Sequence, residues 1–256
     1  MKDNTPQYTD IKKARNGIWA KLDDQYRIAG VCGGKVRACW AIMQAAGNPL
    51  GVVTAAGRAS VQATIVARLA ARLGIPAHCH TATGPVTKEM EDVVAHGGLL
   101  FRHKPGYTNV IICRAMEDAK QNGYLYIPYG LESPIAVKAT ADQVHDIPKE
   151  VKRIVIPVGG GINMAGVLHG LQRTLTFLPI LGIQIGSDPT KNLDKFAPPF
   201  WRGMVEIVKS RYKYSHSLQG GLFGHTLDPI YEAKILEYLQ PGDLAWIVGI
   251  RTTAGG

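Results

Sequence analysis

The stretch of residues 153–166, with the sequence RIVIPVGGGINMAG, constrains the fold of this chain more than any other. Four apolar residues, interrupted only by Pro157, run into three consecutive glycines, and the residues that follow are typical of a helix. A buried strand that breaks at glycines and restarts as a helix exposes backbone N–H groups at the positive helix end. The stretch therefore predicts a phosphate site, or a glycine turn that serves only close packing.

Two nucleotide-binding patterns fail in this stretch. The dinucleotide pattern G-x-G-x-x-G, started at Gly159, needs a glycine where the chain has Met164. The triphosphate pattern G-x-x-x-x-G-K fits from Gly161 to Gly166, but Val167 replaces the lysine that would reach the phosphates. The loop therefore indicates a phosphate without a nucleotide, which raises the question of a phosphorylated cofactor.

Predicted strands and helices alternate along the chain. We expect strands at 50–54, 75–80, 99–101, 124–129, 154–158, 180–186 and 244–250. We expect helices near 10–15, 36–46, 61–73, 87–95, 109–121, 164–174 and 230–239, with 187–224 irregular. Because the strands are apolar on both faces, the pattern predicts an α/β protein with a largely parallel sheet. Ligands of such sheets bind at the carboxyl ends of the strands, where we place the loops that start at Gly57, Gly130, Gly159 and Arg251.

Composition narrows the class of protein. No apolar run among the 256 residues is long enough to span a bilayer, and the polar N-terminus predicts a cytoplasmic protein. The cysteines lack a C-x-x-C pair, so reduced thiols are expected; they are Cys32, Cys39, Cys79 and Cys113. The net charge of +9 would attract an anionic partner, such as nucleic acid, a phosphorylated cofactor or an acidic substrate.

Two single features carry further hypotheses. Gly33 and Gly34 precede a predicted helix, with Lys35 at or near its first turn, where the helix N-terminus disfavours a cation. This placement favours a neutral, nucleophilic amine, although a solvated surface lysine is the plainer interpretation. His78 and His80 share a strand face and could bind a metal, but no matching third ligand is evident, so we expect an ordinary strand and no metal.

Taken together, five segments resemble a known family. They are Gly-Gly-Lys-x-Arg at 33–37, a strand, turn and helix around Ser60, the strand end at 126–130, the glycine loop, and Leu-Asp-Pro-Ile-Tyr-Glu-Ala-Lys at 227–234. Over residues 30–256 the chain resembles the fold-type-II pyridoxal-phosphate enzymes (tryptophan synthase beta-like). It is most similar to the branch of 1-aminocyclopropane-1-carboxylate (ACC) deaminase and D-cysteine desulfhydrase.

The resemblance implies two lobes with three-layer open parallel sheets and a trimmed small lobe. Residues 1–41 and 127–256 would form the large lobe, which binds pyridoxal 5′-phosphate, and residues 42–126 would close over the substrate.

The resemblance also implies roles for single residues. Lys35 would hold the cofactor as an internal aldimine and then move protons at the substrate carbon. Glu232 would face the pyridine nitrogen and keep it protonated, Tyr231 would approach the substrate, and Ser60 would contact the substrate carboxylate or act as a catalytic hydroxyl. The residues expected to line the phosphate are Gly159, Gly160, Gly161, Ile162, Asn163, Met164, Ala165 and Gly166.

The chain departs from the family pattern at the substrate side. Gly34 stands where the family usually has asparagine before the lysine, and Val61 stands where it usually has the asparagine that touches the cofactor's ring oxygen. A further active-site tyrosine of the family has three candidates here, Tyr212, Tyr214 and Phe223. The cofactor side is therefore expected to be retained and the substrate side rebuilt.

The resemblance predicts an enzyme that acts on an amino acid or amine through an external aldimine and a carbanion, most simply a lyase or deaminase. One alternative keeps the cofactor but takes an amino acid attached to a modified nucleic-acid base. Another is a non-catalytic protein that binds pyridoxal phosphate or another phosphorylated ligand. We also expect a homodimer with no membrane partner.

Overall fold

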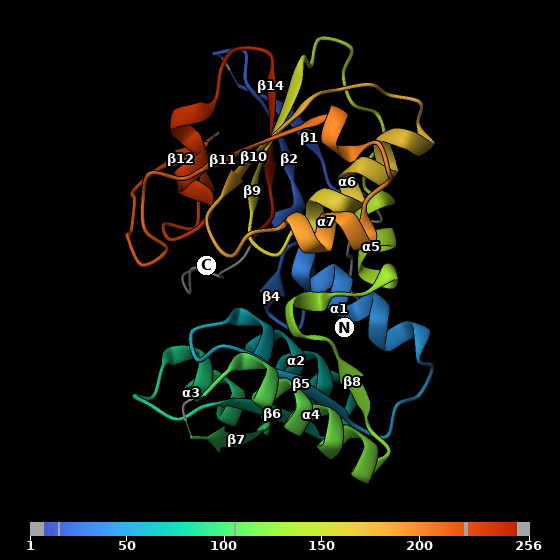
Figure 1. Cartoon of the computed structure of the whole chain (residues 1–256), viewed down its shortest axis with the longest axis vertical. Helices are drawn as coiled ribbons and strands as arrows, with labels where there is room; N and C mark the ends of the chain where they lie inside the picture. The colour runs from blue at the N-terminus through green and yellow to red at the C-terminus, as the bar shows by residue number, and fades with distance from the viewer. Residues whose placement is uncertain (1–7, 15, 105, 223–224, 250–256) are drawn as a thin grey trace. The chain divides into compact units, whose positions relative to one another are not determined.

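A computed structural model describes residues 8–14, 16–104, 106–222 and 225–249 (Figure 1). Of these residues, the ones within 1–27, 32–37 and 136–256 form a first compact unit. The ones within 28–31 and 38–135 form a second unit. Each unit contains its own sheet.

A six-stranded sheet forms the centre of the first unit. Its strands lie in the order β1 (Ile11–Lys13), β2 (Trp19–Leu22), β14 (Asp243–Ile247), β9 (Arg153–Val158), β10 (Ile180–Gln184) and β11 (Val205–Lys209). All neighbours pair in parallel except β1, which is antiparallel to β2. The carboxyl ends of five strands therefore meet at one edge, where ligands of open α/β sheets bind.

Helical segments cover both faces of this sheet. Helix α6 (Ile162–Arg173) packs against the face that carries Gly182, where the Met164 side chain lies. The 3₁₀ helix η4 (Glu232–Tyr238) packs its Ala233 and Ile235 against the opposite face, with Leu181 and Ile183. The other helices that begin in or enter this unit are α1 (Gly34–Ala45), α5 (Pro134–Ala141) and α7 (Thr190–Phe196). The short elements are η1 (Asp23–Gln25), β3 (Arg27–Ile28), β4 (Val31–Cys32), η3 (Trp201–Gly203), β12 (Gly221–Leu222) and β13 (His225–Thr226).

The second unit is a smaller parallel sheet with helices on both faces. Its strands lie in the order β7 (Leu99–His103), β6 (Ala77–Ala82), β5 (Val52–Ala55) and β8 (Leu125–Ile127), with η2 (Tyr129–Leu131) after β8. Helix α4 (Thr108–Asn122) packs against the face of Val53 and Ala55. Helix α2 (Val61–Leu73) reaches the opposite face, where Gln62 bonds to Thr54, and α3 (Lys88–Ala95) packs beside α2.

The predicted α/β class and parallel sheets are confirmed, but three local predictions are wrong. The helix expected near 10–15 is strand β1, and the lead-in also contains β2, an internal strand of the large sheet. The irregular stretch 187–224 contains α7 and β11. Strand β2 was not predicted because it contains a lysine, a residue that is rarely buried. Lys21 is nevertheless fully buried and donates to the carbonyl of Thr9, a contact that local sequence does not reveal. The loop that starts at Arg251 lies outside the described residues.

Pro157 lies in the middle of the large sheet, where a proline would normally cost a ladder hydrogen bond. It stands opposite Ile183 of β10, whereas the pairing of β9 with β14 runs only from Arg153 to Val155. The missing N–H therefore falls where β9 has already parted from β14. The carbonyl of Pro157 accepts a hydrogen bond from the Tyr231 hydroxyl, at 3.4 Å.

Within the described residues, no helix has the length and apolar character needed to cross a membrane. The four cysteines are unpaired, as expected, and three of them are buried.

We predict that Gly170→Ala destabilises the protein, although alanine is the better helix former by about 1 kcal/mol. A Cβ at Gly170 of α6 would press on the Val144 side chain and lie 2.8 Å from the carbonyl oxygen of Ala141. Overpacking of this kind costs about 1–3 kcal/mol. Denaturant unfolding should show the loss, whereas Gly203→Ala, with open space around the new methyl group, should show none. Equal stability of the two variants would contradict the packing described for α6.

Candidate active site

The glycine loop follows β9 at the carboxyl edge of the large sheet. Gly161 has a φ of +86° and forms the N-cap of α6. The Gly160 carbonyl accepts a hydrogen bond of 2.8 Å from Asn192. A Cβ at Gly159 would lie 3.0 Å from the Tyr231 hydroxyl, so the loop passes close to that side chain. The first N–H groups of a helix have no partner within it, and α6 therefore directs donors toward the space above the loop.

Ala165, Gly166 and the side chain of Met164 make contacts within the protein and are not available to an anion. The N–H of Ala165 already donates to the Gly161 carbonyl at 2.9 Å. Met164 is buried, with its side chain against Gly182 of β10. Gly166 packs against Thr140 and the Val137 carbonyl of α5, where a Cβ has no room. The donors open to an anion are therefore those at the start of α6, at Ile162 and Asn163 and from the Met164 backbone.

Lys35 is the second residue of α1 and is half-buried. The two glycines before it cross the chain that follows β14. Gly33 has a φ of +102°, and a Cβ there would collide with the carbonyl group of Gly249. The Gly34 N–H donates to the Val248 carbonyl at 2.8 Å. Only glycine fits at position 33, and this crossing fixes where α1, and with it Lys35, begins.

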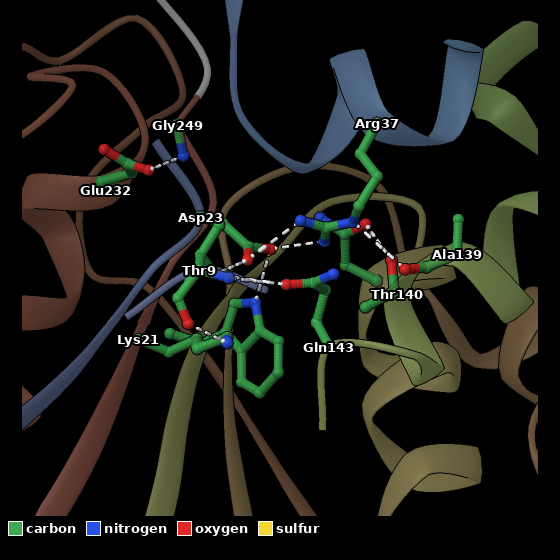
Figure 2. A network of polar contacts seen from close by, with 11 residues as sticks. Thr9, Lys21, Asp23, Arg37, Ala139, Thr140, Gln143, Glu232 and Gly249 are labelled. Carbon is green, nitrogen blue, oxygen red and sulfur yellow. Dashed lines mark hydrogen bonds and ion pairs between the residues drawn. The ribbon is translucent and has the colours of Figure 1, made fainter. Parts of the chain in front are cut away.

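Glu232 is a buried carboxyl group on the other side of the same crossing. One of its oxygens accepts a hydrogen bond from the N–H group of Gly249 (Figure 2). The other oxygen accepts a hydrogen bond from the N–H group of Asp228. Burial raises the pKa of Glu232 to about 7, although both N–H groups favour the carboxylate. The side chain therefore takes up or releases a proton near neutral pH.

Tyr231 lies between Glu232 and the glycine loop. Burial, and after it the neighbouring Tyr214, hold the pKa of the Tyr231 hydroxyl above its ordinary value. The hydroxyl therefore stays protonated at neutral pH and remains a donor. Of the three candidates for a further active-site aromatic residue, Tyr214 lies near Tyr231, whereas Tyr212 bonds to Arg211. The third, Phe223, lies outside the described residues.

The first unit thus gathers the lysine, the glycine loop and the buried carboxyl group at one sheet edge. A Cβ at Gly34 would lie 3.6 Å from the side-chain nitrogen of Asn163, so the start of α1 also meets the start of α6. An anion site, an amine and an acid that titrates near pH 7 suit a cofactor with a phosphate, a carbonyl and a ring nitrogen.

Comparison with protein families decides the identity of this arrangement. The family model described as pyridoxal-phosphate dependent enzyme matches residues 4–213. The chain belongs to this family. The predicted resemblance and the predicted cofactor, pyridoxal 5′-phosphate, are thereby confirmed. No curated protein matches the sequence.

Solved structures of fold-type-II pyridoxal-phosphate enzymes share the fold. An ACC deaminase homologue superimposes with a TM-score of 0.79 at 19% identity, covering 96% of this chain and 90% of that one. Threonine deaminase isoform 2 from Solanum lycopersicum has a TM-score of 0.67 at 18% identity, with 98% and 87% covered. An L-serine ammonia-lyase from the fungus Rhizomucor miehei has a TM-score of 0.66 at 15% identity, with 95% and 93% covered.

The residues present fit pyridoxal phosphate. The start of α6 offers backbone donors for the phosphate, and side chains at Gly159 or Gly161 would press on Tyr231 or Pro189. Glu232 has a pKa of about 7, so it can pass a proton to a ring nitrogen and then face the protonated nitrogen as a carboxylate. Lys35 provides a primary amine on the same edge.

Ser60, the remaining predicted catalytic residue, belongs to the second unit. Its hydroxyl caps α2 by accepting a hydrogen bond of 3.3 Å from the Gln62 N–H. Val61, which departs from the family pattern, is buried at the start of α2. The side chain of Gln62 bonds to the Pro128 carbonyl and the Gly130 N–H, which ties the two predicted ligand loops of this unit together. The catalytic role of Ser60 stays a prediction.

His78 and His80 share a face of β6, as expected, and both contact one oxygen of Asp118 on α4, at 2.8 and 2.9 Å. His80 also bonds to His103 of β7 at 2.8 Å. In the part of the chain that the structure describes, no group of three or more His, Cys, Asp or Glu side chains is placed to hold a metal ion. The four side chains form a hydrogen-bonded chain under α4.

Sequence reasoning included two residues in the 227–234 segment without giving them a role, although both build the site. Asp228 accepts hydrogen bonds from the N–H groups of Ile230 and Tyr231, a turn that aims Tyr231 and Glu232 at the sheet edge. Lys234 is fully buried and donates to the carbonyls of Lys213 and Tyr214, which holds the Tyr214 segment. The Asp-Pro pair was a usable turn signal for Asp228. Nothing local marks Lys234 as buried.

Titration of Glu232 should be visible in the stability of the protein without cofactor. A carboxyl group whose pKa is higher in the folded chain holds its proton more tightly there. The free energy of unfolding therefore falls as the pH rises from about 4.5 to about 7. Relative to Glu232→Gln, the wild type should lose about 1.4 kcal/mol per pH unit in this window, about 3 kcal/mol in all.

The measurement is denaturant unfolding at closely spaced pH values. Glu150→Gln removes an exposed carboxylate and should leave the wild-type profile unchanged. A stability difference between wild type and Glu232→Gln that does not vary with pH would show that Glu232 does not titrate in this range.

Proposed function

We propose that this protein is a pyridoxal-phosphate-dependent enzyme that acts on an amino acid or amine by elimination or deamination. The observation that carries the proposal is Glu232, a buried acid with a pKa of about 7. It accepts a hydrogen bond from Gly249, the residue after Val248, whose carbonyl accepts from Gly34 at the start of α1. An acid at the ring nitrogen strengthens the electron withdrawal on which elimination and deamination depend.

The residues at the carboxyl edge of the large sheet have separate roles. When bound, the cofactor supplies an electron sink for negative charge at the substrate carbon. Lys35 holds the cofactor through its amine and moves a proton at the carbon that bears the substrate amino group. Glu232 keeps a proton on the ring nitrogen. The glycine loop and the first turn of α6 bind the phosphate, and Gly166 shapes the loop through its packing on α5.

Tyr231 and Ser60 receive roles on the substrate side. The Tyr231 hydroxyl, protonated at neutral pH, can donate a hydrogen bond or proton to a leaving group. Ser60 would bind the substrate carboxylate or act as a hydroxyl catalyst. Two of the structural relatives are named as a threonine deaminase and an L-serine ammonia-lyase, which supports a lyase or deaminase acting on an amino acid.

The proposal extends to the organisation of the protein. Residues 1–41 and 127–256 would be the cofactor-binding lobe, and residues 42–126 the lobe that covers the substrate. We propose a homodimer in the cytoplasm.

The cofactor-binding part is tested by absorbance. Purified protein with added pyridoxal phosphate should be yellow, and Lys35→Ala should lose the visible band because the amine that holds the cofactor is gone. Lys120→Ala removes an exposed lysine of α4 and should keep the full band. An unchanged band in Lys35→Ala, or a protein that stays colourless with the cofactor, would refute the assignment.

The reaction is tested with a panel of L- and D-amino acids, by assaying ammonia and 2-oxo acids. Elimination or deamination predicts release of both from at least one member of the panel, and loss of at least about a hundredfold in Lys35→Ala. Cofactor binding without turnover would favour the non-catalytic alternative. Salt-dependent binding of nucleic acid, combined with no turnover of free amino acids, would favour the nucleic-acid-linked substrate.

A further inference from the structure

Asp23 and Arg37 form a buried ion pair beside Lys35. Asp23 follows the last residue of β2 and is fully buried. Arg37 lies in the first turn of α1, and its side chain is also buried, with 5% exposed. Two guanidinium nitrogens of Arg37 donate to the two oxygens of Asp23, at 3.1 and 2.7 Å (Figure 2). A fork of two parallel bonds fixes the direction of both groups, which a single contact does not.

The rest of the Asp23 carboxylate is also bonded. Its oxygens accept hydrogen bonds from the indole N–H of Trp246 and the hydroxyl of Thr9, each at 3.0 Å. Burial by itself raises the pKa of Asp23, but the charge and bonds of Arg37 outweigh it and hold the pKa below its ordinary value. Asp23 is therefore charged at neutral pH and held by groups from α1, from β14 and from Thr9, which precedes β1.

The Asp23–Arg37 pair lies against the backbone of Gly34, the residue before Lys35. A Cβ at Gly34 would lie 3.2 Å from one oxygen of Asp23 and 3.5 Å from a guanidinium nitrogen of Arg37. The third guanidinium donor of Arg37 bonds to the Ala139 carbonyl at 3.1 Å. Gly34, before Lys35, bonds to Val248 at the end of β14. Arg37, after Lys35, bonds to Asp23 at the end of β2 and to Ala139 of α5.

Stability alone does not account for such a pair. Two buried charges are costly to desolvate, and well-packed apolar residues of similar size often stabilise a fold as well or better. A pair of parallel hydrogen bonds also fixes the orientation of the Arg37 guanidinium group relative to the Asp23 carboxylate. The neighbouring cation Lys21, whose pKa burial lowers to about 8, is attracted by Asp23 and repelled by Arg37.

We propose that the Asp23–Arg37 pair is a positioning device that directs Lys35 toward the cofactor. The proposal rests on the assignment of Lys35 as the cofactor-binding lysine. It separates two steps: retention of pyridoxal phosphate by the glycine loop, and condensation of the Lys35 amine with the cofactor's aldehyde, in which a carbon–nitrogen bond replaces the carbonyl bond and water is released. Loss of the pair should impair the second step much more than the first.

A second ion pair of the same unit provides a matched control. Arg153 donates through two nitrogens to the two oxygens of Asp243, at 3.0 and 2.7 Å, and Asp243 is 3% exposed. These residues begin β9 and β14, so they lie at the edge of the sheet opposite to Lys35. Asp243→Asn should cost stability, as Asp23→Asn does, without changing the behaviour of Lys35.

The experiment measures both steps on the full chain. Equilibrium dialysis gives the affinity for pyridoxal phosphate, and borohydride reduction followed by peptide mass analysis gives the rate at which the cofactor becomes attached to Lys35. In Asp23→Asn and in Arg37→Lys, which keeps the charge but not the fork, we expect the rate to fall at least about tenfold. The affinity for the cofactor should stay within about threefold.

The outcomes separate this proposal from the proposed function. If wild-type protein attaches no cofactor to Lys35, the assignment of Lys35 itself fails. If wild type attaches it and the Asp23 and Arg37 variants do so at the rate of Asp243→Asn, the pair is only structural and the proposal is overturned. Failure of every Asp23 and Arg37 variant to fold, with Asp243→Asn folded, would overturn it as well.

Discussion

The candidate site depends on one backbone crossing, where Gly33 and Gly34 pass Val248 and Gly249. Gly33 has a positive φ and no room for a side chain, and Gly34 donates its N–H across the crossing. Gly249 in turn donates to Glu232. A single close approach therefore sets both the start of the helix that carries the lysine and the position of the buried acid, which only residues without a Cβ permit.

Two buried carboxyl groups at this edge are given opposite chemistry by their partners. Glu232 is held by backbone N–H groups, so burial dominates and its pKa rises to about 7. Asp23 is held by the fork of Arg37, and its pKa is lowered despite full burial. The first can exchange a proton near neutral pH, whereas the second is a permanent charge suited to holding structure. Residue type alone does not distinguish them.

Much of the fold was predictable because local patterns and tertiary packing agree. The helix expected at 61–73 is α2, capped by Ser60 at its start and by Gly74 at its end. The strand, glycine turn and helix at 153–173 also form as predicted. Prediction failed at β2 and β11, where charged residues interrupt the apolar pattern. Lys21 lies in a strand because the sheet buries its side chain and the Thr9 carbonyl accepts a hydrogen bond from its amine.

The sequence by itself determined the class of site: glycines before a helix for a phosphate, a lysine after glycines at a helix start, and motif order that indicates the family. These signals are local, so spacing along the chain is enough to read them. Only the tertiary structure decided that Glu232 is buried beside Gly249, that Asp23 pairs with Arg37, and that Lys234 holds the Tyr214 segment. Those properties arise from residues far apart in the chain, because burial and hydrogen-bond partners set the charge and direction of a side chain.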